Sequence, residues 1–277
     1  RNLDGLVVHD LIDVLSEHLR AGEIRFLQGY PCKPLALLAS SFEEVLLLDA
    51  DVYPFSNLSA LFDSNIYQAS GMLQFRDRLQ TSISKTSVVK AVGVSTFVRQ
   101  LIHRNHVQSN RSWIPSDEFL LSPLTIGTSS HVIDSSTLLL HKTKASRVCA
   151  MLYALHENYR HEIYSHLHGD KETLWLACEL SGGGGSCGVT PFAAGVFGSW
   201  QDQQKSRCLN GNLLQFHPDD TSTLVHCNCK PERAVEYTHV SKPTTYNAEF
   251  LSRHSIRGLE EDWHLWMSGL FDGSSEP

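Results

Sequence analysis

The stretch EEVLLLDADVYPF, residues 43–55, decides how the fold is built. Its central run EVLLLD, residues 44–49, is apolar over the length of one strand. Such a run is typical of a strand that is covered on both faces, as in an α/β sheet. Asp49 and Asp51 come at the end of this strand. Because ligands of open α/β sheets bind beyond the carboxyl ends of the strands, we expect a site at these two carboxylates.

Helical and strand-like patterns alternate along the rest of the chain, with short connections between them. This alternation predicts an α/β fold. The apolar spacing predicts helices over residues 4–19, 33–42, 56–64, 144–168, 169–180 and 258–271. Strands are expected within residues 21–29, 44–49, 129–140, 213–220 and 222–231. The region from about residue 76 to about residue 125 has no clear pattern, and the glycine-rich residues 181–188 are expected to form a loop.

The composition excludes several classes of protein. With 277 residues and 42% hydrophobic content, the chain is expected to form one domain over residues 1–277, with residues 232–277 as a C-terminal extension. A formal net charge of −7 argues against a nucleic-acid partner. Since no apolar run approaches the roughly 18 residues of a membrane span, any membrane anchor is expected outside this chain.

Seven cysteines are present, and no two of them form a Cys-x-x-Cys pair. Two Asn-x-Ser sequons, at Asn57 and Asn110, favour a secretory compartment, where cysteines can pair. The spacing of the cysteines leaves their pairing open.

Asp49 and Asp51 are separated by one residue, so on an extended segment their side chains point the same way. Two carboxylates placed like this can hold one hard cation such as Mn²⁺ or Mg²⁺, which could neutralise a diphosphate leaving group. The alternative is that the two acids only solvate the end of a strand.

The segment LVHCNCKP, residues 224–231, offers a third ligand and a phosphate partner. A neutral His226 could complete the metal site, and the Lys230 ammonium could bind a phosphate. Alternatives are a solvated surface or a zinc site built on His226, Cys227 and Cys229, although a zinc site would lack a clear second half.

Asp170 and Glu172, in the segment HGDKET, are the candidate catalytic residues. Asp170 would line the sugar pocket as an electrostatic partner or as a hydroxyl acceptor. Carboxylates are also common at the start of a helix without any further role, because they interact with the exposed N–H groups there. No Gly-x-Ser-x-Gly motif is present, so serine-hydrolase chemistry has no support.

Taken together, these segments resemble a known family. Residues 30–67, from YPCKPLALLASSF to LFDSNIY, resemble the core of the fungal Golgi α-mannosyltransferases of the Mnn type, glycosyltransferase family 71. That family has a Lys-Pro helix followed by an apolar strand that ends in Asp-Ala-Asp. The segments HGDKETLWLA, LLQFHPDD and LVHCNCKP are similar to later family segments and occur in the same order.

The resemblance implies a GT-A-like fold with a central, mostly parallel sheet flanked by helices. It also implies a retaining transfer from a nucleotide sugar, GDP-mannose in the best-known members, to a glycan or glycoprotein acceptor. The location would be the Golgi lumen, with a type II membrane anchor upstream of this chain. By position, the resemblance implies the metal ligands Asp49, Asp51 and His226, the donor-binding residues Lys33, Asp49, His131 and Lys230, and Asp170 in the sugar pocket.

The sequence departs from the family pattern in two places. TSSHVID, residues 128–134, replaces an acidic-Ser-Gly-Gln type of run, which changes the expected pocket contacts near His131. The family also has a first nucleotide-binding strand ahead of its opening helix, and we expect this chain to lack it. Two other readings stay open: the same fold with a UDP-sugar donor, and a catalytically inactive lectin-like or assembly module.

Overall fold

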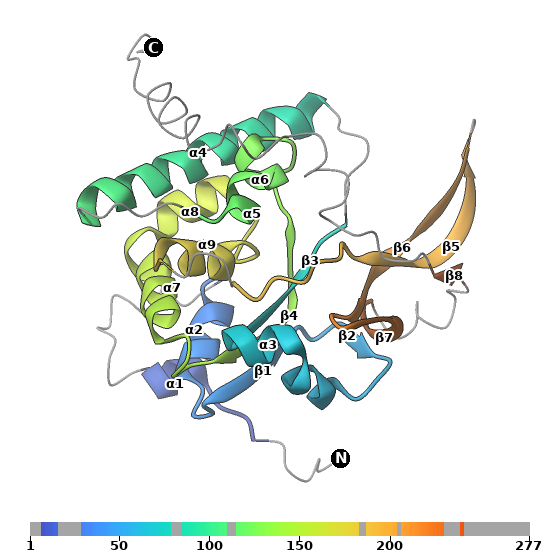
Figure 1. Ribbon diagram of the computed structural model, residues 1–277, viewed down its shortest axis with the longest axis horizontal. Coiled ribbons are helices and arrows are strands. Elements are labelled where there is room, and N and C mark those ends of the chain that lie inside the picture. Colours follow the sequence, from blue (N-terminus) through green and yellow to red (C-terminus); the bar gives the residue numbers. More distant parts are fainter. Residues whose placement is uncertain are drawn as a thin grey trace.

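The structure is a computed structural model that describes residues 7–15, 29–78, 85–109, 115–182, 187–203, 206–229 and 239–240. The predicted tail helix over 258–271, nearly all of the predicted strand over 21–29 and most of the extension 232–277 lie outside these ranges. Figure 1 shows most helices on one side of a first small sheet and a second sheet on the other side.

Two antiparallel sheets form the framework. The first has the order β1-β4-β3, with β1 at Glu44–Leu48, β4 at Ile133–His141 and β3 at Met72–Arg76. The second has the order β2-β7-β6-β5-β8, with strands Val52–Pro54, Asp220–Asn228, Ser206–His217, Gly195–Gln203 and His239–Val240. Every pair of these strands is antiparallel. The mixed α/β class is therefore confirmed, but the prediction of a mostly parallel sheet is wrong for the described residues.

The apolar runs arise because both faces of the first sheet are covered. In β4, Leu138 and Leu140 pack into the main core, whereas Leu139 packs into a separate cluster on the other face with Leu73 and Phe75. Helices α2 (Cys32–Ala39), α4 (Lys85–Ser109), α7 (Ser146–Asn158) and α9 (Thr173–Leu180) contribute to the main core. A run of apolar residues therefore indicates that both faces of a strand are covered, but it does not indicate whether the neighbouring strand is parallel or antiparallel.

Several helices differ from the predicted ones. The single helix predicted over 144–168 is two helices, α7 and α8 (Arg160–His166), because the backbone leaves the helical conformation at Tyr159. The predicted helix over 56–64 is a 3₁₀ helix, η2 (Leu58–Asp63), whose N-cap is Asn57. The shorter helices are α1 (Leu11–Leu15), α3 (Asn65–Ser70), α5 (Asp117–Leu120) and α6 (Pro123–Ile126). Among the described helices, none combines the length and the apolar character that a membrane crossing requires.

The chain passes from the first sheet to the second at Asp49–Asp51. The Asp49 N–H donates to the Ser136 carbonyl of β4 at 2.8 Å, and the Asp51 carbonyl accepts from the Cys229 N–H, just beyond β7, at 2.9 Å. β2 begins at the next residue, Val52. The two carboxylates therefore lie where the two sheets meet.

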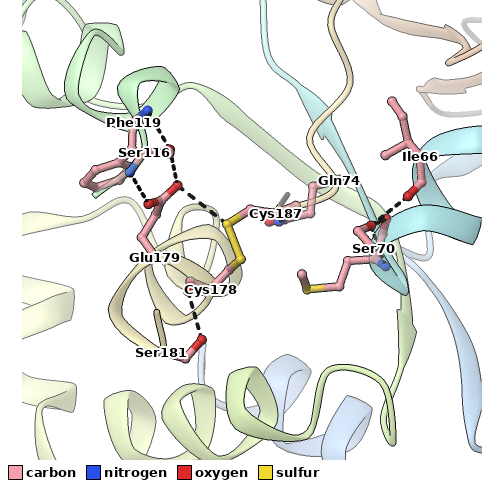
Figure 2. The surroundings of a disulfide bond; sticks show 10 residues. Ile66, Ser70, Gln74, Ser116, Phe119, Cys178, Glu179, Ser181 and Cys187 are labelled. Atoms are coloured by element: carbon pink, nitrogen blue, oxygen red, sulfur yellow. Dashed lines mark hydrogen bonds between the residues drawn. A yellow bond between two sulfur atoms is a disulfide. The ribbon is translucent and has the colours of Figure 1, made fainter. Parts of the chain in front are cut away.

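A disulfide between Cys178 and Cys187 joins the buried helix α9 to the segment that begins at Cys187, at the end of the glycine-rich stretch (Figure 2). This segment lies along β3, where the Gln74 N–H donates to the Gly188 carbonyl and the Gln74 amide donates to the Cys187 carbonyl. Gly188 has a φ of +63°, and a Cβ atom there would lie 2.2 Å from the Met72 carbonyl oxygen, so this position requires glycine.

We expect the double variant Cys178→Ala/Cys187→Ala to lower the free energy of unfolding by about 2–4 kcal/mol, because the disulfide restricts the unfolded chain. Urea denaturation at constant pH measures this change. Cys149→Ala, which removes a half-buried thiol outside any disulfide, is the matched control. A double variant no less stable than the control would contradict the expectation.

Candidate functional site

A pocket lies between the start of α2, strands β1 and β4, and the start of α9. Much of its wall is apolar and is formed by Pro34, Leu37, Leu47, Ile133, Leu138, Leu152 and Leu174. The polar side chains that line it are Lys33, Gln74, Asp134, Ser135, Asp170, Lys171 and Thr173. An apolar hollow with a few convergent polar groups is the usual form of a small-molecule site.

Lys33 connects three elements around this pocket. Its Nζ atom donates to Asp49 Oδ1 at 2.8 Å and to Ser135 Oγ at 3.1 Å, and it lies 3.4 Å from Asp170 Oδ2. Pro34, which has no N–H, suits the first turn of α2 and allows the helix to begin at this place. Three of the predicted site residues, Lys33, Asp49 and Asp170, are thus brought together.

Further charges lie beside Asp170. Burial raises the pKa of the Asp170 carboxyl, and the Lys33 ammonium opposes this shift. The neighbouring Lys171 Nζ donates to Asp77 Oδ2 at 3.0 Å, and His131 Nε2 lies 3.7 Å from the same oxygen. Burial lowers the pKa of His131, although Asp77 opposes it, so the imidazole is neutral near pH 7. His131 does not line the pocket. It lies near Asp77, and Asp77 in turn is bonded to Lys171, which does line the pocket.

Asp134 forms a buried polar link between the two sheets. Its Oδ2 atom accepts hydrogen bonds from the Gln215 amide of β6 at 2.8 Å and from Ser136 Oγ at 3.0 Å. Burial raises the pKa of Asp134, and these hydrogen bonds oppose the shift. The same Gln215 amide donates to the Arg76 carbonyl at 3.0 Å, so Gln215 of β6 is bonded to both β3 and β4 of the first sheet.

Glu172 has a different place from the one predicted. It is fully buried, is not found among the residues that line the pocket, and accepts hydrogen bonds from the Val132 and Ile133 N–H groups on one carboxylate oxygen. The other oxygen has no hydrogen-bond partner among the described residues. In this position Glu172 holds the start of β4 against α9, which is a positioning role, whereas Asp170 faces the pocket.

The predicted metal ligands are only partly assembled. No three His, Cys, Asp or Glu side chains in the described part of the chain form a group that could hold one metal ion. His226 is fully buried against Phe75, its ring nitrogens have no partner among the described residues, and burial lowers its pKa to about 3. Asp49, Asp51 and His226 are therefore not gathered into a three-residue ligand set.

The neighbour of Asp51 is instead Asn228, the last residue of β7. With its nitrogen turned toward Asp51, the Asn228 amide donates to both carboxylate oxygens, each at 3.0 Å. Cys227 and Cys229 form a disulfide with each other, which removes the thiolates that the alternative zinc site would need. Lys230 lies outside the described residues.

Sequence reasoning missed several polar residues of the site, among them Asp77, Ser135, Lys171 and Asn228. Asn228 carried a signal, because it lies two residues after His226 and side chains two apart on a strand share a face. Lys171 lies beside Asp170 in the quoted segment HGDKET. Asp77 and Ser135 gave no signal of their own, since only the pairing of β3 with β4 brings them near the pocket.

The fold and the site define a mixed α/β protein with a charged pocket between its first sheet and the helices that cover that sheet. A family model of mannosyltransferases, Mannosyl_trans3, matches residues 4–227. Because this match covers most of the chain, the chain belongs to that mannosyltransferase family. The resemblance to the fungal Mnn-type enzymes is confirmed.

The relatives are fungal mannosyltransferases of two linkage types. Alpha-1,3-mannosyltransferase MNT2 of Saccharomyces cerevisiae is 29% identical over 161 residues, covering 55% of this chain and 27% of the relative. Alpha-1,3-mannosyltransferase MNT3 of the same yeast is 27% identical over 261 residues, covering 87% and 40%. Alpha-1,2-mannosyltransferase MNN2 of Candida albicans is 47% identical over 49 residues, covering 18% and 8%. The matched part of this chain thus spans less than half the length of these relatives.

The pKa of Glu172 leads to a pH prediction. Burial raises it to about 8, so between its unfolded value of about 4.3 and pH 8 the native state keeps a proton that the unfolded state has lost. The free energy of unfolding therefore falls as the pH rises through this window, by up to roughly 1.4 kcal/mol per pH unit. In Glu172→Gln, whose side chain cannot titrate, the free energy of unfolding should lack this part of its pH dependence. Urea denaturation of the parent and of Glu172→Gln from pH 5 to pH 8 tests this prediction. If the free energies of unfolding of the two proteins differ by the same amount at every pH, the prediction is wrong.

Proposed function

We propose that this chain carries the donor site of a retaining, metal-dependent α-mannosyltransferase with a GT-A-like arrangement, which moves mannose from GDP-mannose to a glycan or glycoprotein acceptor. One observation carries the proposal: Lys33, which lines the pocket, joins Asp170 of the same lining to Asp49, which follows β1 and lies two residues before Asp51 in the chain. Membership in the mannosyltransferase family supports it. The names of the relatives include both alpha-1,3 and alpha-1,2 transferases, so we propose no linkage.

The charges around the pocket support a requirement for a cation. Among the described residues, Lys33 and Lys171 face the carboxylates of Asp49, Asp77 and Asp170. Asp51 adds a further carboxylate two residues after Asp49. A nucleotide diphosphate would meet an excess of negative charge there. A divalent cation would offset that excess.

The donor atoms at the end of β1 fit such a cation. Asp51 offers two carboxylate oxygens, and the Asn228 amide lies 3.0 Å from both. Oxygen donors of this kind suit Mn²⁺ or Mg²⁺. When bound, the ion would neutralise the charge that develops on the departing diphosphate.

The chain's own residues would bind and orient the donor. Lys33, held between Asp49 and Asp170, would keep both carboxylates in place and offer a positive charge to the diphosphate. Asp170, at the pocket lining, would accept a hydrogen bond from a sugar hydroxyl. The apolar wall that includes Leu47 and Leu138 would limit the access of water to the reacting centre. We assign no enzyme nucleophile.

We propose the Golgi lumen as the compartment, with a membrane anchor upstream of this chain. The disulfides Cys178–Cys187 and Cys227–Cys229 support a secretory location, because disulfides persist in oxidising compartments and are rare in the cytosol.

The first test concerns Asp51. Asp51→Asn should lower mannosyl transfer or hydrolysis of GDP-mannose, measured with Mn²⁺, by about a hundredfold or more, because a major source of charge stabilisation is lost. Asp117→Asn makes the same change at an exposed acid on α5 and should leave the rate unchanged. Full activity of Asp51→Asn would rule out a metal-binding role for this residue.

A panel of donors separates the alternatives. Thermal unfolding is measured with GDP-mannose, UDP-glucose and UDP-galactose, each with and without Mn²⁺, because a ligand of the native state raises its apparent stability. We expect an increase with GDP-mannose that depends on Mn²⁺. An increase only with a UDP-sugar would favour the alternative donor. No Mn²⁺-dependent increase with any donor would favour the inactive lectin-like or assembly module.

A further inference from the structure

The end of β7 is fixed against Asp51 by the backbone. Asn228 pairs with Val52 of β2, and the next residue, Cys229, donates its N–H to the Asp51 carbonyl at 2.9 Å. The side chains of Asp51 and Asn228 are therefore held close by the strand pairing, and their contact does not depend on a flexible loop between them.

The Asn228 amide can face Asp51 in two ways. With the nitrogen toward Asp51, it donates to both carboxylate oxygens at 3.0 Å. The two ends of an amide are nearly equal in size, so the group can be turned to present its oxygen with little change of shape. Three oxygens would then lie together, an arrangement that is unfavourable alone but suits a hard divalent cation.

The other acid of the pair is already occupied. Asp49 Oδ1 accepts the hydrogen bond from Lys33, so the first carboxylate of Asp-Ala-Asp has a positive partner from the protein itself. Asp51 has the Asn228 amide and no lysine or arginine partner among the described residues. The two acids thus have different neighbours: Asp49 a cation of the protein, and Asp51 a group that can change from donor to ligand.

The disulfide Cys227–Cys229 restricts the backbone on both sides of Asn228. Its two cysteines are buried and separated by two positions, so the ring that they close contains Asn228. A side chain whose backbone is held in this way loses little freedom when it binds a ligand. The ring therefore favours a fixed position for the amide beside Asp51.

We propose that Asn228 supplies the third protein oxygen to a divalent cation at Asp51, in the role that sequence patterns give to His226. This inference rests on the proposed function, because it concerns the same cation. In the absence of the ion, the amide nitrogen faces Asp51; when the ion binds, the amide oxygen faces it.

Binding of Mn²⁺ alone tests the inference without any activity assay. Free Mn²⁺ is measured by electron paramagnetic resonance during titration of the parent protein and of Asn228→Ala, Asn228→Ser and Asn228→Asp. We expect Asn228→Ala to weaken binding by at least about tenfold. Asn228→Ser, which keeps an oxygen, should lie between Asn228→Ala and the parent, and Asn228→Asp should bind Mn²⁺ at least as tightly as the parent.

The aspartate variant separates a ligand from a simple hydrogen-bond donor. A second carboxylate beside Asp51 repels it, so Asn228→Asp should have a lower midpoint of thermal unfolding without Mn²⁺, and Mn²⁺ should raise that midpoint more than it raises the parent's. Asn158→Asp, an exposed position at the end of α7, makes the same change as a control.

The outcomes are distinct. If all Asn228 variants bind Mn²⁺ like the parent, or if Asn228→Asp binds as weakly as Asn228→Ala, the inference is wrong while the cation site can stand. If Asn228→Asp does not fold, the Mn²⁺ affinities of the other two variants decide. Affinities that fall from the parent to Asn228→Ser to Asn228→Ala support the inference, and any other order contradicts it. If the parent binds no Mn²⁺, the proposed metal dependence fails and the inference fails with it.

Discussion

The passage of the chain from one sheet to the other at Asp49–Asp51 is the constraint on which the site depends. The Asp49 N–H is hydrogen-bonded to β4, and the Asp51 carbonyl is hydrogen-bonded to the residue after β7. Neither residue can move away without breaking a backbone hydrogen bond to a sheet. Both residues lie in the connection between β1 and β2, and each is hydrogen-bonded to a different sheet although only Ala50 separates them. The two carboxylates therefore have different partners: Lys33 for Asp49, and Asn228 of β7 for Asp51.

The neighbours on the side of the first sheet form a compensated set of charges. Half-buried carboxylates are costly unless cations or hydrogen bonds accompany them. Lys33 meets this need for Asp49 and Asp170, and Lys171 meets it for Asp77. The pocket is therefore polar without containing an isolated buried charge at these positions, which lets it stay open to a ligand without losing its shape.

Sequence patterns predicted the local parts of this arrangement and missed the long-range parts. The strand β1, the helix start at Lys33 and the helix that follows Asp170 could be predicted, because apolar runs, a proline in a first turn and a glycine-aspartate break act locally. The antiparallel insertion of β4 between β1 and β3 could not, since both strand directions bury the same apolar residues. The sequence predicts His226 as a ligand from its residue type and gives no role to Asn228, because the neighbours of a β7 side chain are set by strand pairing.

Both disulfides lie on segments that carry the site, and this arrangement links the oxidation of the cysteines to the shape of the pocket. Cys178 belongs to α9, whose start lies directly after Asp170, and its bond to Cys187 holds the segment along β3 behind the pocket. Cys227 and Cys229 hold the end of β7 at Asp51. Cys187 is buried in the main core, and Cys227 and Cys229 are buried in a separate cluster with Leu214 and Phe216. The segments at the pocket and at Asp51 are therefore held both by side-chain packing and by covalent bonds.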